Sequence, residues 1–152
     1  MKVLEFGIVR AARDPADASQ GHTRENAVQG TPAFIAPEQA MGTDLDGRAD
    51  IYATGCVAYW LLTGQFVFTA ETAVGLLLQH AQTAPAPPSC RTDLPIPTAL
   101  DELVLSCLAK DPADRPQSAR ELSRRLAEVE GANAWTQERA RDWWVTHQLA
   151  LP

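Results

Sequence analysis

The sequence of 152 residues predicts a mainly α-helical fold: a helical bundle with one short N-terminal strand and a long loop ahead of the helices. Three observations lead to this prediction. Apolar residues recur at helical spacing in several segments after Pro37, a polar stretch before Pro37 has no periodicity, and only residues 2–9 have the pattern of a strand. The length favours one compact domain with at most a short tail.

Residues 2–9 are apolar and β-branched with a glycine near their end, which predicts a short strand followed by a turn. The polar stretch 10–29 comes next and predicts a long exposed loop. Loops longer than about 12 to 15 residues without internal structure are uncommon in compact domains, and they are usually functional or mobile. This loop is therefore a candidate functional segment.

The segment 50–63 predicts a helix with apolar residues on nearly every side, ended by Gly64 as a left-handed cap. Such a helix needs neighbours all round, so we expect it at the centre of the bundle. A second helix is predicted on the surface, with a core-facing stripe formed by Val74, Leu77, Leu78 and Ala81. The proline-rich stretch 84–89 cannot continue that helix and predicts a connector.

Thr98 followed by Asp101 resembles a capping box, which predicts the start of a third helix. Its apolar face is formed by Leu100, Leu103, Val104, Cys107 and Leu108. A further helix is predicted to end at Gly131, with an apolar stripe formed by Ala119, Leu122, Leu126 and Val129. We expect the tail 136–148 to be helical too. The large apolar side chains of Trp135, Trp143 and Trp144 should dock on the preceding bundle.

The charge balance, 13 Lys and Arg against 19 Asp and Glu, gives a net charge of -6 and argues against a nucleic-acid surface. The longest apolar run, 51–62, has 12 residues and is shorter than the roughly 20 that a membrane helix needs. Charged residues within 1–15 interrupt any signal-peptide core, so we expect a cytoplasmic location. The three cysteines fit neither a disulfide framework nor zinc-ligand spacing, and we expect Cys56 and Cys107 in the core.

Four short stretches are informative because of their order and spacing. They are Leu4-Glu5-Phe6-Gly7, Gly30-Thr31-Pro32-Ala33-Phe34-Ile35-Ala36-Pro37-Glu38, Asp50-Ile51-Tyr52-Ala53-Thr54-Gly55 and Lys110-Asp111-Pro112-Ala113-Asp114-Arg115-Pro116. Together they resemble the C-terminal (large) lobe of a bacterial-type serine/threonine protein kinase domain, from its Asp-Phe-Gly motif onward, and the resemblance covers residues 2–129. It implies a partial protein kinase domain over 1–130, with an activation segment at 5–38 and a helical subdomain at 39–130, followed by a Trp-rich helical tail at 131–152.

By this resemblance the long loop is the activation loop, with Thr23 as the candidate phosphorylation site. The plainer alternative is that Thr23 and Ser19 are ordinary polar loop residues. The resemblance also implies a shelf on which a protein substrate rests beside its target hydroxyl, and this shelf is formed by Gly30, Thr31 and Pro32.

The resemblance implies structural roles for a few more residues. Glu38 is expected to pair with Arg115, because a bidentate guanidinium can tie the end of the activation segment to the helical core. Asp50 either accepts hydrogen bonds from the catalytic loop, as in the family, or is stabilised only by the positive helix N-terminus. Phe6 and Gly7 complete the Asp-Phe-Gly-like motif as structural residues.

Phosphoryl transfer by protein kinases requires a Gly-rich loop, a strand lysine, a catalytic-loop Asp and Asn, and a metal-binding Asp. The sequence has no Gly-rich loop and no His-Arg-Asp triplet, and neither of its lysines, Lys2 and Lys110, occupies the required strand. Glu5 replaces the metal-binding aspartate, and its longer side chain should hold Mg²⁺ poorly. We therefore expect no complete catalytic site and no cofactor for this chain alone, although ATP and Mg serve the intact family.

Two functions stay open at this point. One is an ATP-dependent serine/threonine kinase fragment, inactive as an isolated chain; the alternative is a catalytically dead kinase-like module that binds a protein. Its partner would be a protein substrate or an intact kinase. A third, plainer interpretation is a helical protein that shares the motifs by chance.

Met1 directly precedes the predicted strand, so the sequence is either a short protein or a kinase coding sequence that begins late. The family helix that covers the central helix is missing. Exposed apolar patches promote association, so we expect the isolated chain to form oligomers or aggregates.

Overall fold

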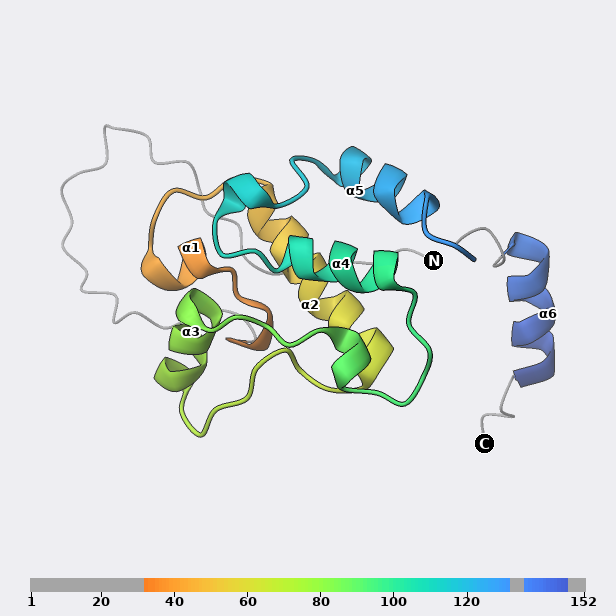
Figure 1. Cartoon of the computed structure of the whole chain (residues 1–152), viewed down its shortest axis with the longest axis horizontal. Helices are drawn as coiled ribbons and strands as arrows, with labels where there is room; N and C mark the ends of the chain where they lie inside the picture. Colours follow the sequence, from red (N-terminus) through yellow and green to blue (C-terminus); the bar gives the residue numbers. More distant parts are fainter. Residues whose placement is uncertain (1–31, 132–135, 148–152) are drawn as a thin grey trace, which may run out of the picture.

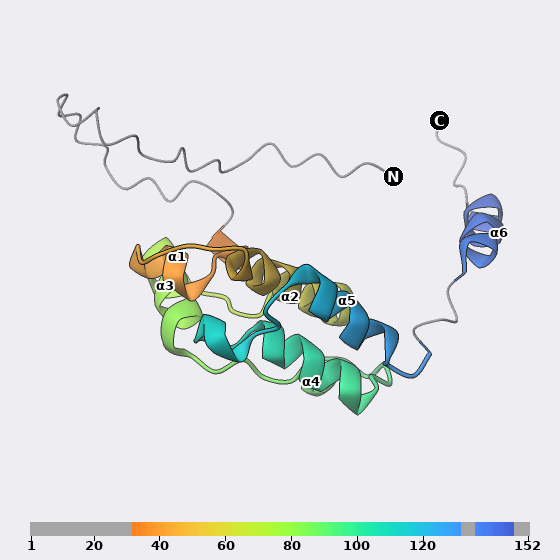
Figure 2. The ribbon, with the colours of Figure 1, turned by 90° about the horizontal axis from the view of Figure 1, so that it is seen from above.

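The computed structural model describes residues 32–131 and 136–147, and all regular structure in these ranges is helical (Figures 1 and 2). The mainly α-helical fold class is therefore confirmed, and no strand occurs within the described residues. The predicted strand at 2–9 and the long loop lie outside them. Also outside them are the predicted site residues Glu5, Phe6, Gly7, Thr23, Gly30 and Thr31.

Helix α2 (Arg48–Thr63) runs through the middle of the bundle, preceded by the short 3₁₀ turn η1 (Pro32–Phe34) and helix α1 (Pro37–Met41). Its start is two residues earlier than predicted, because the carboxylate of Asp46 accepts a 2.8 Å hydrogen bond from the Arg48 N–H. Its end is at Gly64, as predicted. The positive φ of Gly64, 68°, is the left-handed conformation that glycine adopts without strain.

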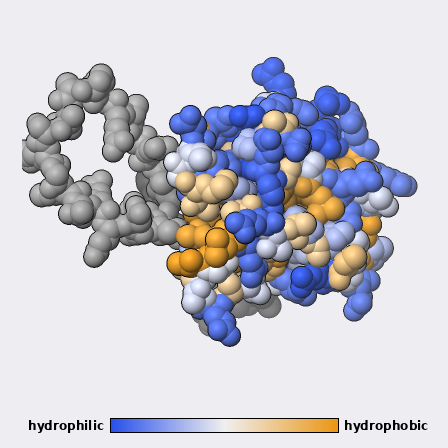
Figure 3. Space-filling model, turned by 60° about the vertical axis from the view of Figure 1, so that its left-hand side comes forward, coloured by the Kyte–Doolittle hydropathy of each residue, from blue (hydrophilic) through white to orange (hydrophobic). Residues whose placement is uncertain are grey.

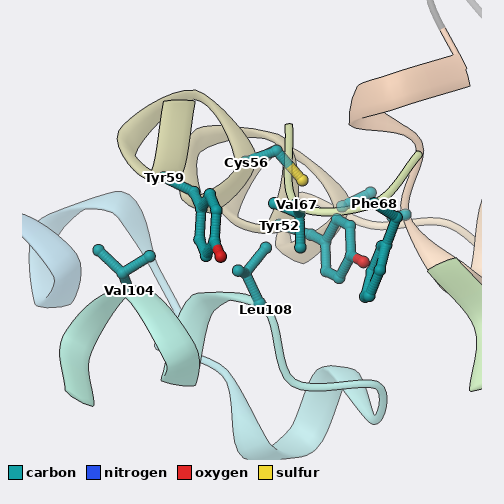
Figure 4. Close-up of a cluster of buried hydrophobic side chains, with 9 residues drawn as sticks. Tyr52, Cys56, Tyr59, Val67, Phe68, Val104 and Leu108 are labelled. Atoms are coloured by element: carbon teal, nitrogen blue, oxygen red, sulfur yellow. The ribbon is translucent and has the colours of Figure 1, made fainter. Parts of the chain in front are cut away.

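The main core cluster lies on one face of α2, where Tyr52, Cys56 and Tyr59 are all buried (Figure 4). Their spacing of four and then three residues places them on one side of a helix. They pack against the segment after α2 and against the helix that follows the connector. The remaining buried members of the cluster are Ala36, Ala49, Val67, Phe68, Val104 and Leu108.

Helix α3 (Ala73–Gln82) lies beside α1, as Figure 1 shows, and the side chain of Thr72 accepts a hydrogen bond from Gly75 N–H at its start. The helix was predicted, but the stripe assigned to its core side is wrong at Val74 and Leu78, whereas Leu77 and Ala81 are half-buried. Val74 and Leu78 are 66% and 53% exposed, while His80 is completely buried and Leu76 packs against the core. Helix α3 therefore turns another face toward the core than the hydrophobic pattern predicts. That face carries His80, whose polar partner inside the core the pattern could not reveal.

The connector contains the 3₁₀ turn η2 (Pro88–Cys90) and leads to helix α4 (Thr98–Cys107). The capping box predicted at its start is wrong, because Pro97 occupies the cap position and Thr98 already belongs to the helix. Asp101 is buried instead, and its carboxylate accepts hydrogen bonds from the backbone N–H of Ser89 at 3.0 Å and from its hydroxyl at 2.6 Å. The predicted apolar face of α4 does point into the core.

The 3₁₀ turn η3 (Pro112–Asp114) precedes helix α5 (Ala119–Ala127), whose cap is Ser118. The predicted stripe is correct at Leu122 and Val129, but Ala119 and Leu126 are exposed, and the helix ends before Gly131. A second core cluster joins α5 to α2 and α4. It consists of Ile51, Leu103, Cys107, Leu122 and Val129. Both Cys56 and Cys107 are buried, as predicted from the sequence.

Helix α6 (Gln137–His147) confirms that the tail is helical, but the docking predicted for its tryptophans is wrong for the described residues. The helix has no buried residue, and Figures 1 and 2 show it apart from the bundle. Trp143 stacks on His147 and meets Trp144 edge to face, so the rings find contacts within their own helix. Trp135 lies outside the described residues.

The surface carries apolar side chains on more than one side of the bundle. On α2, Val57, Trp60 and Leu61 are exposed, Leu61 by 70%. Their spacing of three and one residues gives α2 an apolar face opposite the core side. Figure 3 shows apolar patches within a largely polar surface on the side where α1 and α3 lie. None of the described helices has the length and apolar character needed to cross a membrane.

The close packing of α2 against α4 at Gly55 predicts that Gly55→Ala destabilises the fold. A methyl group at Gly55 would come within 2.7 Å of the Cys107 Cβ, and both atoms belong to rigid helices. Overpacking of this kind costs about 1 to 3 kcal/mol. Urea unfolding should show this loss of stability. The control is Gly47→Ala, where a methyl group has open space, and equal effects of the two substitutions would contradict the prediction.

Candidate functional site

The structure brings Glu38 and Arg115 together, 77 positions apart in the chain, as a buried bidentate ion pair. Nη1 of Arg115 lies 2.7 Å from Oε1 of Glu38, and Nη2 lies 2.7 Å from Oε2. Glu38 is only 5% exposed and Arg115 only 3%. The pair therefore joins the start of α1 to the segment after η3, and water does not screen it.

The remaining donors of Arg115 are satisfied by backbone carbonyls. Nε donates to Ala109 at 2.8 Å, Nη1 donates to Arg48 at 2.9 Å and Nη2 donates to Lys110 at 3.1 Å. With the two bonds to Glu38, all five N–H groups of the guanidinium are used. The guanidinium carbon also lies 5.0 Å from the centre of the Tyr52 ring. A lysine could not make this set of contacts, because it lacks the planar array of donors.

Asp50 lies in the first turn of α2, where its side chain is exposed and has no hydrogen-bond partner among the described residues. This position suits the favourable interaction of a carboxylate with a helix N-terminus. The family role would need a catalytic loop, which the sequence does not contain. Both interpretations of Asp50 therefore stay predictions.

Pro32 is the only described residue of the predicted shelf, and it begins the turn η1. The turn is short, and its backbone hydrogen bond from Ile35 N–H to the Pro32 carbonyl is 3.5 Å long. Contacts to α2 and α3 support it from outside. Ala33 is buried there, and the ring of Phe34 meets the edge of Phe66 with centroids 5.9 Å apart.

A buried polar cluster next to η1 was missed by sequence reasoning. His80 is completely buried, and its Nδ1 lies 2.9 Å from the hydroxyl oxygen of Tyr52. Lys110 donates from Nζ to the backbone carbonyl of His80 at 2.8 Å, and the same Nζ lies 4.6 Å from the centre of the Phe68 ring. The available signal was weak: a single histidine four residues after Leu76 on a predicted amphipathic helix.

Burial sets the protonation states in this cluster. It lowers the pKa of His80 to about 4, with a further contribution from the nearby Lys110 ammonium and an opposing one from the Ala33 backbone. Burial also lowers the pKa of Lys110 to about 8. Burial raises the pKa of the Cys56 thiol to about 12, so this cysteine is an inert core residue. At neutral pH the histidine is uncharged and Lys110 is the cation of the cluster.

The described residues do not fit a nucleotide with its metal ion. No group of three or more His, Cys, Asp or Glu side chains in 32–131 and 136–147 is arranged to hold a metal. An open groove of about 430 Å³ lies between the segment after α2, the end of α3 and the connector, and its lining contains no carboxylate. We therefore assign no residue to ATP or Mg²⁺ and derive no catalytic step through them.

Comparisons with known proteins identify the family of this chain. The model of the protein kinase domain family matches residues 1–126, which is most of the chain. The chain therefore belongs to the protein kinase domain family, and the resemblance given above is confirmed.

Bacterial serine/threonine kinases are among its relatives. Serine/threonine-protein kinase pkn3 of Myxococcus xanthus is 42% identical over 131 residues, which cover 86% of this chain and 24% of that protein. Probable serine/threonine-protein kinase PknB of Corynebacterium glutamicum is 43% identical over 132 residues, covering 85% of this chain and 20% of the relative. PknB of Mycobacterium tuberculosis is 42% identical over 129 residues, with the same coverage of 85% and 20%. The chain thus spans between a fifth and a quarter of the length of these relatives.

The buried ion pair predicts that Arg115→Ala is strongly destabilising. The substitution leaves the Glu38 carboxylate buried without its partner, which costs about 3 to 5 kcal/mol. The matched control is Arg124→Ala, which breaks the exposed pair with Glu128 and should cost about 1 kcal/mol or less. Thermal unfolding measures both. A melting temperature unchanged by Arg115→Ala would contradict the role of the pair.

The lowered pKa of His80 predicts that stability decreases as the pH falls from about 6.5 to 4. In this range the unfolded chain binds a proton at His80 that the folded chain does not bind, so unfolding becomes more favourable. The stability is fully present above about pH 6.5, and the loss by pH 4 amounts to roughly 3 kcal/mol. Urea unfolding at several pH values tests this. In His80→Gln this part of the pH dependence should disappear, and an identical profile in the variant would rule the explanation out.

Proposed function

We propose that this chain is the substrate-side part of a bacterial-type serine/threonine protein kinase, and that it transfers no phosphate on its own. The observation that carries the proposal is the Glu38–Arg115 pair, which fixes the segment directly after the predicted shelf to the helical core. A shelf for a protein substrate must be held still relative to the reacting groups, because catalysis of phosphoryl transfer depends almost entirely on positioning and electrostatics.

The lack of activity is supported by what the chain offers to a nucleotide. The sequence contains no Gly-rich loop and no His-Arg-Asp triplet, and its described residues contain no metal-binding cluster. Lys110 cannot take the place of the strand lysine, because its ammonium is held by the His80 carbonyl and lies against the Phe68 ring. Glu5 occupies the family's metal-binding position by resemblance, and it carries one methylene too many for the family geometry.

Thr23 remains the proposed phosphorylation site of the activation segment, by resemblance alone. A phosphate there would add charge of about −1.5 to −2 and could order the loop through basic side chains. The proposed partner is a protein substrate or an intact kinase, in line with the kinase names of the relatives. The cytoplasmic location also stays a proposal.

The exposed apolar face of α2 supports the proposal that the isolated chain associates with itself or with another protein. Val57, Trp60 and Leu61 together expose a surface that water does not solvate well. Size-exclusion chromatography should therefore show oligomers, and Trp60→Gln combined with Leu61→Gln should shift the protein toward monomer. A sharp monomer peak for the unmodified chain would contradict this.

A second candidate function is a catalytically dead kinase-like module that binds a protein partner. The observation that favours it is the completeness of the helical core: Arg115 has all of its donors satisfied within the described residues, and two core clusters meet at α2 and α4. A domain of this kind can hold a surface in place without any chemistry. Saturable binding of one host protein by monodisperse material would favour this function.

The proposed function predicts the outcome of two phosphate-transfer assays. The purified chain with ATP and Mg²⁺ should transfer no labelled phosphate to a protein substrate. A chimera in which this chain replaces the matching segment of Mycobacterium tuberculosis PknB should be active, because the missing groups are then supplied. In the chimera Glu5→Asp should raise kcat, since aspartate restores the usual metal geometry. Phosphate transfer by the chain alone, or a chimera that folds and stays inactive even with Glu5→Asp, would contradict the proposal.

A further inference from the structure

The open groove of about 430 Å³ has no part in the proposed function. One side of it is lined by residues 64–69, which follow α2, and another by the end of α3 and the connector. Arg91 also lines it. Ligand sites in proteins typically have volumes of about 300 to 1,000 Å³. The groove is therefore large enough for a few residues of a peptide.

Two glutamines hold the sides of the groove together. Nε2 of Gln79, near the end of α3, donates to the Thr69 carbonyl at 3.0 Å. Nε2 of Gln65 donates to the Arg91 carbonyl at 3.2 Å. Both bonds join the segment after α2 to another part of the lining. The groove is thus preformed, and little conformational entropy is lost from its walls when a ligand enters.

Main-chain groups beside the groove lack partners. Val67 and Phe68 are only 4% and 7% exposed, because their side chains pack into the core beside Tyr52 (Figure 4). Within residues 32–131 and 136–147, the N–H and C=O groups of Phe66, Val67 and Phe68 form no hydrogen bond. Buried main-chain groups in native proteins are almost always paired. Since these three residues line the groove, a ligand in it can supply the missing partners.

The groove also has a charge preference. Arg91 is the one charged residue among the described residues that line it. The residue is exposed, and its guanidinium forms no ion pair with any residue that the structure describes. A guanidinium binds a carboxylate through charge-assisted hydrogen bonds. A ligand with a carboxylate is therefore favoured over a neutral or a cationic one.

We propose that the groove binds an extended segment of a partner protein that carries an aspartate or glutamate side chain. The main chain of this segment pairs with the N–H and C=O groups of residues 66–68, as in peptides that add to the edge of a sheet. Its carboxylate binds Arg91, and an apolar side chain covers Phe66, which is 44% exposed. This binding is separate from the shelf predicted at 30–32 and needs no phosphate transfer, so it does not rest on the proposed function.

Peptide libraries test the charge preference. The full chain is immobilised and exposed to three libraries of hexapeptides, which are identical except that one fixed position carries Glu, Gln or Lys. The glutamate library should be retained about fivefold more than the glutamine library, as expected for one solvent-exposed ion pair. The lysine library should be retained least. Equal retention of the three libraries, or a preference for lysine, would overturn the proposal.

A matched pair of variants locates the effect. Arg91→Gln removes the charge but keeps the main-chain carbonyl that Gln65 binds, so the groove should stay intact. This variant should retain the glutamate and glutamine libraries equally. The control is Arg120→Gln, which removes an exposed arginine of α5 that does not line the groove and should leave the preference unchanged. A preference that survives Arg91→Gln would place the carboxylate elsewhere and contradict the proposal.

Hydrogen exchange tests the main-chain contacts. A peptide selected from the glutamate library should slow exchange of the amides of residues 66–68 about tenfold. The amide of Leu108, which donates to the Val104 carbonyl within the core, should be unaffected. The same peptide with N-methylated amides should bind about tenfold more weakly, because it cannot donate to the groove. Unchanged exchange at residues 66–68 would rule out the pairing. Slowing that appears without peptide as the protein concentration rises would assign the groove to a second copy of this chain and would equally overturn the proposal.

Discussion

The described fold depends on one buried guanidinium. Arg115 uses all five of its N–H groups, two on Glu38 and the others on the carbonyls of Arg48, Ala109 and Lys110. These partners belong to the start of α1, the start of α2 and the segment after α4, which are far apart in sequence. A single side chain therefore fixes three chain segments relative to one another. Its charge is tolerated inside the protein because a carboxylate and three carbonyl dipoles compensate it.

Tyr52 links this ion pair to the second buried polar group. One face of its ring lies near the Arg115 guanidinium, and its hydroxyl contacts His80. Lys110 closes the arrangement through the His80 carbonyl and the Phe68 ring. Apolar side chains alone would pack α2 against its neighbours in several related ways, whereas these directional contacts allow only one.

The chain belongs to the protein kinase domain family. Under the proposed function its helices hold a segment that positions a protein substrate, while its described residues show no cluster of side chains arranged to hold a metal ion. In phosphoryl transfer these are separable tasks, because one set of groups places the acceptor and another neutralises charge on the phosphates. The described helices keep two packed core clusters and leave one apolar face of α2 exposed.

The sequence by itself determined that the segments of α2 to α6 are helical and that α2 ends at Gly64, because helical periodicity, prolines and Gly64 act over a few residues. It did not predict α1 or the end of α5. The kinase motifs also identified Glu38 and Arg115. Only the tertiary structure decided which side of α3 is buried, that Asp101 binds Ser89 instead of capping its own helix, and that His80 is buried against the Tyr52 hydroxyl. Each of these depends on a polar partner distant in sequence, and a hydrophobic pattern carries no record of such partners.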